Sequence, residues 1–290
     1  AYYGLQLINK NPRPGIEAVL SHANVYRLEE EPQSEAEHPQ NVLNKEVTIS
    51  DLVFMIGPRI NAAGRLEKAS DSVRLLIADK KEHADKLASS INDLNVRRRE
   101  FDNRITEEAL AMIEQNETLR NAKSTVLFNE NWHKGVIGIV ASRLTDSYYR
   151  PTIVLTRSNN LITGSARSIK NFDIYDAIDN CSDLLEHFGG HKYAAGLSLK
   201  PENLEEFSRR FEEYVANNID KEELIPELNV DLEIDFSDIT PKFVRVLKQF
   251  APFGPGNMAP VFLSRNVVDT GLSRSVGKKK HLKLTITPRQ

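Results

Sequence analysis

The sequence is poor in residues on which several classes of protein depend. It has one cysteine, Cys181, in 290 residues, so it can form no disulfide within the chain and has no set of thiolates for a structural zinc. We therefore expect a reducing compartment, the cytoplasm. With only 14 Gly and 13 Pro, the collagen-like and low-complexity classes are also excluded.

Long apolar segments are missing as well. No window approaches the roughly 18 uninterrupted apolar residues of a membrane span. Residues 1–20 lack the basic flank, apolar core and small-residue cleavage site of a secretory signal. We therefore expect neither a membrane protein nor a secreted one.

The motifs that bind metals or nucleotide phosphates in other proteins are not found. The sequence contains no HExxH, no Cys–His ligand set, no P-loop Gly-Lys-Ser/Thr and no acidic cluster of the metal-ligand type. Chemistry that needs a metal therefore finds no ligands in this chain, and we assign no metal-binding residue.

The remaining composition is typical of a globular protein of two or three domains, with 40% hydrophobic and 27% charged residues. The net charge of −3 argues against a surface that is basic throughout. Residues 270–290 nevertheless contain no acid and carry Arg274, Lys278, Lys279, Lys280, Lys283 and Arg289. A local basic surface for nucleic acid is compatible with this distribution.

The first 120 residues have a helical pattern. Residues 4–9, 16–20 and 71–78 predict short helices, and residues 59–66 predict a loop of small residues that carries Asn61 and Arg65. Residues 82–115 contain no Gly or Pro, and their apolar residues recur at three- and four-residue spacing. This spacing predicts one long helix that lies against other elements.

The second half alternates between strands and helices. Strands are expected at 124–128, 151–156, 161–168 and 194–199, and helices at 138–144, 174–188 and 203–219. The alternation predicts an α/β fold with a central sheet flanked by helices. Short β runs at 228–234, 261–263, 267–272 and 281–287 then predict a small barrel or an open sheet. Because the chain begins within a helical pattern and stops within a strand pattern, we expect a piece of a longer protein.

Ser165 and Arg167 form the first candidate site. They follow Gly164 at the end of a predicted strand, where residues two apart share a face. A hydroxyl beside a guanidinium suits the oxygens of a phosphate, and the glycine allows close approach of a ligand. The alternative is that Arg167 forms an ordinary surface ion pair.

Two further candidates are weaker. Gly189 and Gly190 are expected to cap the helix at 174–188, with His191 behind them and small residues nearby that would admit a bulky ligand. Arg59, Asn61 and Arg65 form a second possible anion site. In both cases the alternative is structural: a helix cap with a passive histidine, and a loop whose arginines pair with acids.

Five motifs in order along nearly the whole chain resemble the RecJ family of bacterial exonucleases. They are GPRINAAGR at 57–65, WHKGVIGIVASR at 132–143, GSARS at 164–168, GGH at 189–191 and PFGPGN at 252–257. Members of this family degrade single-stranded DNA from 5′ to 3′ in recombination and repair, and they belong to the DHH phosphoesterase superfamily. The motifs resemble the C-terminal part of the family.

The resemblance implies a domain order. Residues 1–80 would be the end of a DHH domain, 81–117 a long connecting helix, 118–221 the DHH-associated α/β domain and 222–290 a truncated OB-fold-like β barrel. In this family a two-metal centre of Mn²⁺ or Mg²⁺ is held by Asp and His residues of the DHH domain. The resemblance therefore implies that the metals belong to the full-length enzyme, that this chain binds none, and that it is inactive alone.

The resemblance also implies roles for the candidate residues. Ser165 and Arg167 would hold the 5′-phosphate of the DNA, with Arg65 as partner and Asn61 beside it. Gly189, Gly190 and His191 match the motif that faces the metal centre and contacts phosphate near the cut, so His191 is the catalytic candidate. The lysines of the OB side, Lys278, Lys279 and Lys280, would attract the DNA backbone.

The expected partner is single-stranded DNA, with DNA-repair proteins such as a helicase or a single-strand-binding protein as further possible partners. Two alternatives to the exonuclease remain open. One is a binding module for single strands without chemistry of its own, and the other is a relative in the same superfamily that cuts short RNA or small phosphodiesters.

Overall fold

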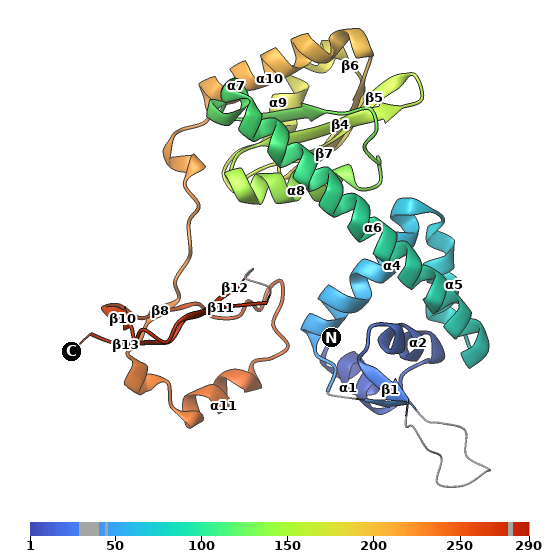
Figure 1. The fold of residues 1–290 in the computed structure, drawn as a ribbon, viewed down its shortest axis with the longest axis vertical. Coiled ribbons are helices and arrows are strands. Elements are labelled where there is room, and N and C mark those ends of the chain that lie inside the picture. Colours follow the sequence, from blue (N-terminus) through green and yellow to red (C-terminus); the bar gives the residue numbers. More distant parts are fainter. Residues whose placement is uncertain (29–40, 44–45, 278–280, 290) are drawn as a thin grey trace. The chain divides into compact units, whose positions relative to one another are not determined.

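The computed structural model describes residues 1–28, 41–43, 46–277 and 281–289. They form two compact units, one of Gln6–Pro226 and one of Ala1–Leu5 with Glu227–Gln290. Figure 1 shows the course of the chain. Within the described ranges, no helix combines the length and the apolar character needed to cross a membrane.

The N-terminal part of the chain is mainly helical, as the sequence predicts. Its elements are α1 (Tyr2–Lys10), α2 (Pro14–His22), the antiparallel pair β1 (Tyr26–Leu28) and β2 (Asn41–Leu43), α3 (Ile49–Asp51), a π-helical turn (Leu52–Ile56), α4 (Gly57–Leu66) and α5 (Ala69–Ile77). The predicted loop at 59–66 is wrong, because these residues form α4. Pro58 fits the first turn of that helix, and Ala62 and Ala63 are fully buried, so their small side chains serve close packing.

The predicted long helix is confirmed as α6 (Lys81–Gln115), which is followed by the short α7 (Glu117–Asn121). Buried residues recur along one side of α6, including Ala88, Ile91, Ile105 and Ile113. The helix contacts α2, α4 and α5 along its first half and α8 (Ile137–Tyr148) along its second. It therefore joins the helical part to the sheet, as Figure 1 shows.

The central part of the chain is an α/β domain built on one five-stranded sheet. The strands are β3 (Thr125–Phe128), β4 (Thr152–Ser158), β5 (Leu161–Arg167), β6 (Leu185–His191) and β7 (Ala194–Leu199), in the order β3-β4-β5-β7-β6. Only β3 and β4 are parallel. Helix α8 and the second half of α6 pack on one face, and α9 (Ile174–Asp179) and α10 (Leu204–Asn218) pack on the other.

One predicted helix in this domain is wrong. Residues 174–188 form α9, a 3₁₀ turn (Ser182–Leu184) and the first part of β6. Residues 185–188 alternate polar and apolar side chains poorly, and their pairing with β7 decides their conformation. Gly189, Gly190 and His191 therefore end an edge strand rather than cap a helix.

The C-terminal unit consists of short elements. They are β8 (Leu232–Glu233), a 3₁₀ turn (Phe236–Asp238), α11 (Pro241–Gln249), β9 (Phe262–Leu263), β10 (Val267–Asp269), β11 (Arg274–Val276), β12 (His281–Lys283) and β13 (Ile286–Pro288). The 3₁₀ turns at Pro201–Asn203 and Glu222–Leu224 belong to the other unit, before and after α10. β8 pairs with β9, β10 with β13 and β11 with β12. The small β structure is as expected, whereas α11, capped by the Thr240 hydroxyl, was not predicted.

Arg150 ties the end of the long helical segment to the sheet. It is 5% exposed, and its guanidinium donates hydrogen bonds to Thr125 Oγ1 at 2.7 Å and to the carbonyl oxygens of Leu119 at 2.8 Å, Arg120 at 3.3 Å and Ala122. Three of these acceptors are carbonyls of α7 and the residue that follows it. The side chain thus satisfies a helix end that would otherwise be buried without donors.

We expect Arg150→Met to lower the free energy of unfolding by about 3 kcal/mol, because it leaves several buried oxygens without a donor. Arg157→Met is the matched control. Arg157 is half exposed and pairs with Glu130 at 3.4 Å, so its loss should change stability by less than about 1 kcal/mol. Thermal or urea unfolding of both variants measures the difference, and equal stability of the two would contradict this role for Arg150.

Candidate nucleic-acid interface

Ser165 and Arg167 are in direct contact on β5. The Arg167 Nη1 donates to Ser165 Oγ at 3.0 Å and to the Ala166 carbonyl oxygen at 2.7 Å, and its Nε donates to Ser142 Oγ of α8 at 3.2 Å. Both side chains are half-buried on the sheet face that α8 covers. The shared face that the alternation of β5 predicts is therefore present.

Gly138 allows α8 to come close to this pair. A Cβ atom at Gly138 would lie 2.9 Å from Ser165 Oγ and 3.2 Å from Arg167 Nη2. The small residue at the start of the helix is thus a packing requirement, and it brings the first turn of α8 onto the two polar side chains.

Arg167 is surrounded by positive rather than negative charge. Burial lowers the pKa of its guanidinium, and the neighbouring Arg65 lowers it further. Among the described residues Arg167 forms no salt bridge with a carboxylate, so the alternative of a surface ion pair finds no support. Arg65, in the last turn of α4, is exposed and donates to the Gly135 carbonyl oxygen at 3.3 Å. Two guanidinium groups that repel each other suit a ligand of negative charge.

Next to Ser165 the sheet presents a floor of glycine. Ser165 pairs with Gly196 of β7, which in turn pairs with Gly189 of β6, so the three lie in one row across the sheet. A Cβ atom at Gly196 would meet only the Gly164 carbonyl oxygen, at 3.9 Å, and one at Gly189 would meet nothing within 4 Å. We name Gly189 and Gly196 the glycine floor. A ligand can approach the protein backbone at these two glycines without meeting a side chain.

His191 lies at the edge of this face. Arg167 pairs with Ala194, and Ala194 pairs with His191, so these residues form the row beside the glycine floor. The His191 ring is exposed, and its Nδ1 accepts the Tyr193 backbone N–H at 3.3 Å. In the neutral ring the proton is therefore on Nε2, which can donate to a ligand.

Gly190 has a structural reason to be glycine. A Cβ atom there would lie 2.3 Å from the Ala194 carbonyl oxygen and 2.5 Å from the Ala195 Cα. Any side chain would push β6 away from β7. The conformation of the hairpin accounts for this residue without a ligand.

The remaining predicted residues are not brought into the same place. Asn61 is exposed one turn before Arg65 on α4, and no contact joins it to Ser165 or Arg167. Lys278, Lys279 and Lys280 lie outside the described residues. Of the same basic segment the structure describes β11 and β12, where Arg274 lies opposite Lys283 and both are exposed.

The sequence reading missed a buried charge cluster between α6 and α8. The Asp102 side chain is fully buried, and its Oδ2 accepts from Arg143 Nη2 at 2.8 Å and lies 3.4 Å from Arg98 Nη1. Burial raises the pKa of Asp102, while Arg143, Arg98 and Arg65 lower it. The one sequence signal was Arg98, a charged residue in the apolar register of the long helix.

The described residues do not fit a metal centre. Residues 1–28, 41–43, 46–277 and 281–289 contain no group of three or more His, Cys, Asp or Glu side chains placed to hold a metal ion. The groups that meet at the candidate site, Ser165, Arg167 and Arg65, are a hydroxyl and two guanidinium groups, which suit an anion.

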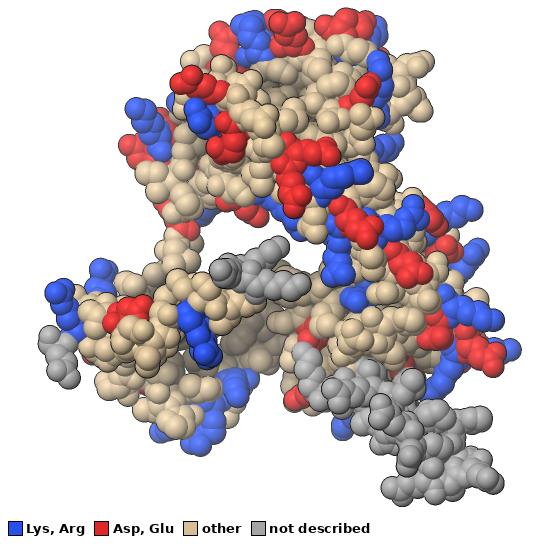
Figure 2. Space-filling view, in the orientation of Figure 1, with Lys and Arg blue, Asp and Glu red and all other residues tan. Residues whose placement is uncertain are grey.

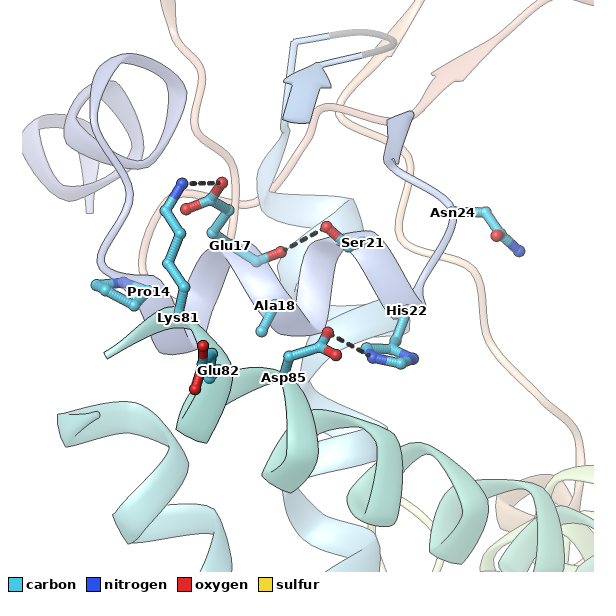
Figure 3. A pocket seen from close by; sticks show the side chains of 9 residues that line it. All are labelled: Pro14, Glu17, Ala18, Ser21, His22, Asn24, Lys81, Glu82 and Asp85. Atoms are coloured by element: carbon cyan, nitrogen blue, oxygen red, sulfur yellow. Dashed lines mark hydrogen bonds and ion pairs between the residues drawn. The ribbon is translucent and has the colours of Figure 1, made fainter. Parts of the chain in front are cut away.

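A cavity of about 620 Å³ lies elsewhere, between α2 and the start of α6 (Figure 3). Four of its side chains form two pairs, Lys81 with Glu17 at 3.2 Å and His22 with Asp85 at 3.1 Å, and Glu82 lines it as well. None of the predicted site residues lines it. Because each basic side chain here has an acidic partner, the cavity lacks the uncompensated positive charge of the Arg65 and Arg167 site.

The molecular surface has no broad field of one sign in the view of Figure 2, where acidic and basic side chains alternate over the sheet domain and the long helix. This agrees with the net charge of −3. On this face, local clusters of guanidinium groups are the features that would attract an anion.

Two models of known domain families match separate parts of the chain. A DHHA1 domain model matches residues 121–217, and a RecJ OB domain model matches residues 230–290. The first range contains the five-stranded sheet with Ser165, Arg167 and His191. The second contains the small β elements of the C-terminal unit.

Curated relatives cover most of the chain. The single-stranded-DNA-specific exonuclease RecJ of Bacillus subtilis is 38% identical over 235 residues, which are 80% of this chain and 30% of that protein. RecJ of Haemophilus influenzae is 33% identical over 300 residues, which are 100% of this chain and 49% of that protein. The chain thus spans half the length of these relatives or less.

A solved structure shows the same fold. The crystal structure of RecJ from Thermus thermophilus in complex with Mn²⁺ superposes with a TM-score of 0.79 at 27% identity, over 98% of this chain and 38% of that one. With the two domain matches in the same order along the sequence, these similarities show that the chain belongs to the RecJ family and corresponds to the part that contains the DHHA1 and OB domains.

Proposed function

We propose that this chain is the substrate-binding half of a single-stranded-DNA-specific 5′-to-3′ exonuclease of recombination and repair. The observation that carries the proposal is the contact of Ser165 with Arg167 beside the open glycine floor. It combines a hydroxyl, a guanidinium without a carboxylate partner in the described structure and an unobstructed backbone. This is the arrangement that a phosphate at the end of a DNA strand requires.

The charge of the ligand explains why the phosphate at the end of a strand would be preferred to an internal phosphate. A terminal phosphate monoester carries about −1.5 to −2 at neutral pH, because its second pKa is about 6. An internal phosphate diester carries a single negative charge. Arg167 and Arg65 repel each other, so the ligand with more negative charge relieves more of this repulsion. Ser165 Oγ would donate to a phosphate oxygen beside them.

The glycine floor would carry the backbone of the strand away from its 5′ end. His191 lies two strands from Arg167, about 10 Å between backbones. We propose that it contacts a different phosphate, near the cut, through its Nε2–H. The lysines at 278–280 and the described Arg274 and Lys283 would also attract the DNA backbone.

The metal centre of the complete enzyme would come from the part of the family that this chain does not span. Solved RecJ structures from Thermus thermophilus contain Mn²⁺ or Mg²⁺. We propose the same metals for the full-length protein. Among the described residues no ligand set for these metals is found. We propose that the described residues contribute by holding and orienting the DNA.

We further propose the division of the chain into residues 1–80 of a DHH domain, 81–117 as connector, 118–221 as the DHH-associated domain and 222–290 as the OB-like domain. A cytoplasmic setting is proposed too, with a helicase or a single-strand-binding protein as candidate partners that deliver the DNA.

The first prediction concerns catalysis. The chain alone should release no nucleotides from single-stranded DNA in millimolar Mn²⁺, because a two-metal mechanism needs carboxylate ligands. Release of radiolabelled nucleotides measures this. An activity that co-purifies with the protein and is abolished by EDTA would refute the assignment of the metal ligands to another part of the enzyme.

The second prediction concerns the end of the strand. Arg167→Ala should weaken binding of a 5′-phosphorylated oligothymidylate about ten- to a hundredfold, which corresponds to the loss of a charge-assisted contact of roughly 1.5–3 kcal/mol. The advantage of that ligand over the 5′-hydroxyl form should disappear. Arg209→Ala, on α10 across the sheet, is the control and should change neither affinity. Equal losses for the two ligands would exclude end recognition by Arg167.

The third prediction concerns the glycine floor. Gly196→Leu should weaken single-strand binding at least tenfold, because the new side chain occupies the proposed path of the backbone. The position is exposed and has space for a Cβ atom, and thermal unfolding checks that the variant is folded. Gly4→Leu, at another glycine with open space, is the control. Wild-type affinity of Gly196→Leu in a fluorescence titration would show that DNA does not cross the floor.

A further inference from the structure

Where α6 and α8 meet, two arginines, Arg98 and Arg143, share one carboxylate, Asp102, and we name these three residues the seam. The positive charges of the seam outnumber its negative charge. Arg98 and Arg143 both contact the one buried carboxylate, Asp102, and Arg65 is close enough to affect the pKa of both Asp102 and Arg98. Two guanidinium groups thus contact a single negative charge, and the charge of a third, that of Arg65, acts on it electrostatically. Such a cluster remains attractive to a further anion.

Of the two arginines that contact Asp102, Arg143 is the one that solvent can reach more readily. Its side chain is 45% exposed, whereas that of Arg98 is 12% exposed. Two contacts fix its guanidinium on α6: Nη2 donates to Asp102 Oδ2 at 2.8 Å, and Nη1 donates to Asn103 Oδ1 at 3.4 Å. In the described structure these contacts use two of its five N–H donors. The group is therefore held in place and still has donors for a ligand.

The seam is continuous with the site on β5. Ser142, the residue before Arg143 on α8, accepts a hydrogen bond from Arg167 Nε at 3.2 Å. Arg65 links the two places electrostatically, because its charge contributes to the lowered pKa of both Arg98 and Arg167. Because Arg143 follows Ser142 on α8, a single strand bound at Arg167 would lie close to this second guanidinium.

We propose that Arg143 binds an internal backbone phosphate of the strand whose 5′-phosphate is held by Ser165 and Arg167, with Asp102 as the residue that positions its guanidinium. The proposal rests on the proposed function and adds a second phosphate site to it. A planar guanidinium anchored on one side by a carboxylate presents its remaining N–H groups in a fixed direction, which favours a phosphate with two oxygens over a base edge.

Arg143→Gln tests the proposal directly. The affinity for oligothymidylate should fall about five- to tenfold, equally for the 5′-phosphate and 5′-hydroxyl forms, because the contact is not to the end. The slope of log K against log salt should become less negative by about 0.7, the value for one phosphate contact on a single strand. Arg157→Gln is the control, since Arg157 has similar exposure and pairs with Glu130 outside the seam. Wild-type affinity and slope in Arg143→Gln would overturn the proposal.

Asp102→Asn tests the positioning role. It removes the charge that anchors Arg143, so we expect a loss of about three- to fivefold in the wild-type background and none in the Arg143→Gln background. The same loss in both backgrounds would assign Asp102 to folding alone. If thermal unfolding shows that Asp102→Asn is not folded, Asn103→Ala replaces it in the same comparison of the wild-type and Arg143→Gln backgrounds. Asn103→Ala removes the second anchor of Arg143 at an exposed position.

The outcomes also separate this inference from the proposed function. Loss of end selectivity in Arg167→Ala together with an unchanged Arg143→Gln would overturn the second phosphate site alone. A wild-type chain that binds no single strand at any salt concentration would overturn the proposed function itself.

Discussion

The packing of α6 against α8 is the contact on which the candidate site depends. Ile105, Ala109 and Ile113 of α6 share one buried core with Val140 and Leu144 of α8. Because α6 also contacts α4, this core fixes the position of Arg65 relative to the sheet. The charge of Arg65 can then lower the pKa of Arg167, although the two residues are about a hundred positions apart in sequence. A long helix thus does more than join two parts of the chain, since it sets the distance between charges.

Small residues complete the arrangement. Gly138 lets α8 approach Ser165 and Arg167, and the glycine floor leaves the neighbouring strands bare on the same face. The polar groups are therefore concentrated beside a surface that offers backbone rather than side chains. This combination suits a flexible polymer of negative charge, because the polymer can lie close to the sheet while its phosphates reach the guanidinium groups. Gly190 differs, since its lack of a side chain is required by the hairpin.

The sequence predicts local periodicity well and long-range pairing poorly. The period of 3.6 identifies α6 to within one residue at its start, and the period of two places Ser165 and Arg167 on one face. The end of the predicted helix at 174–188 is wrong because pairing with β7, not local preference, decides it. The Asp102 and Arg143 contact joins residues 41 positions apart, so no local pattern announces it. The expected helix cap at Gly189 and Gly190 is wrong for the same reason as the helix end, since both glycines and His191 lie in β6.

The most direct test of this account is a crystal structure of the chain with a 5′-phosphorylated oligothymidylate. The account predicts that the terminal phosphate lies within hydrogen-bonding distance of Ser165 Oγ and the Arg167 guanidinium, with the following nucleotides over Gly196 and Gly189. A terminal phosphate bound elsewhere, for example only on the hairpin of β11 and β12, with the glycine floor empty, would contradict it.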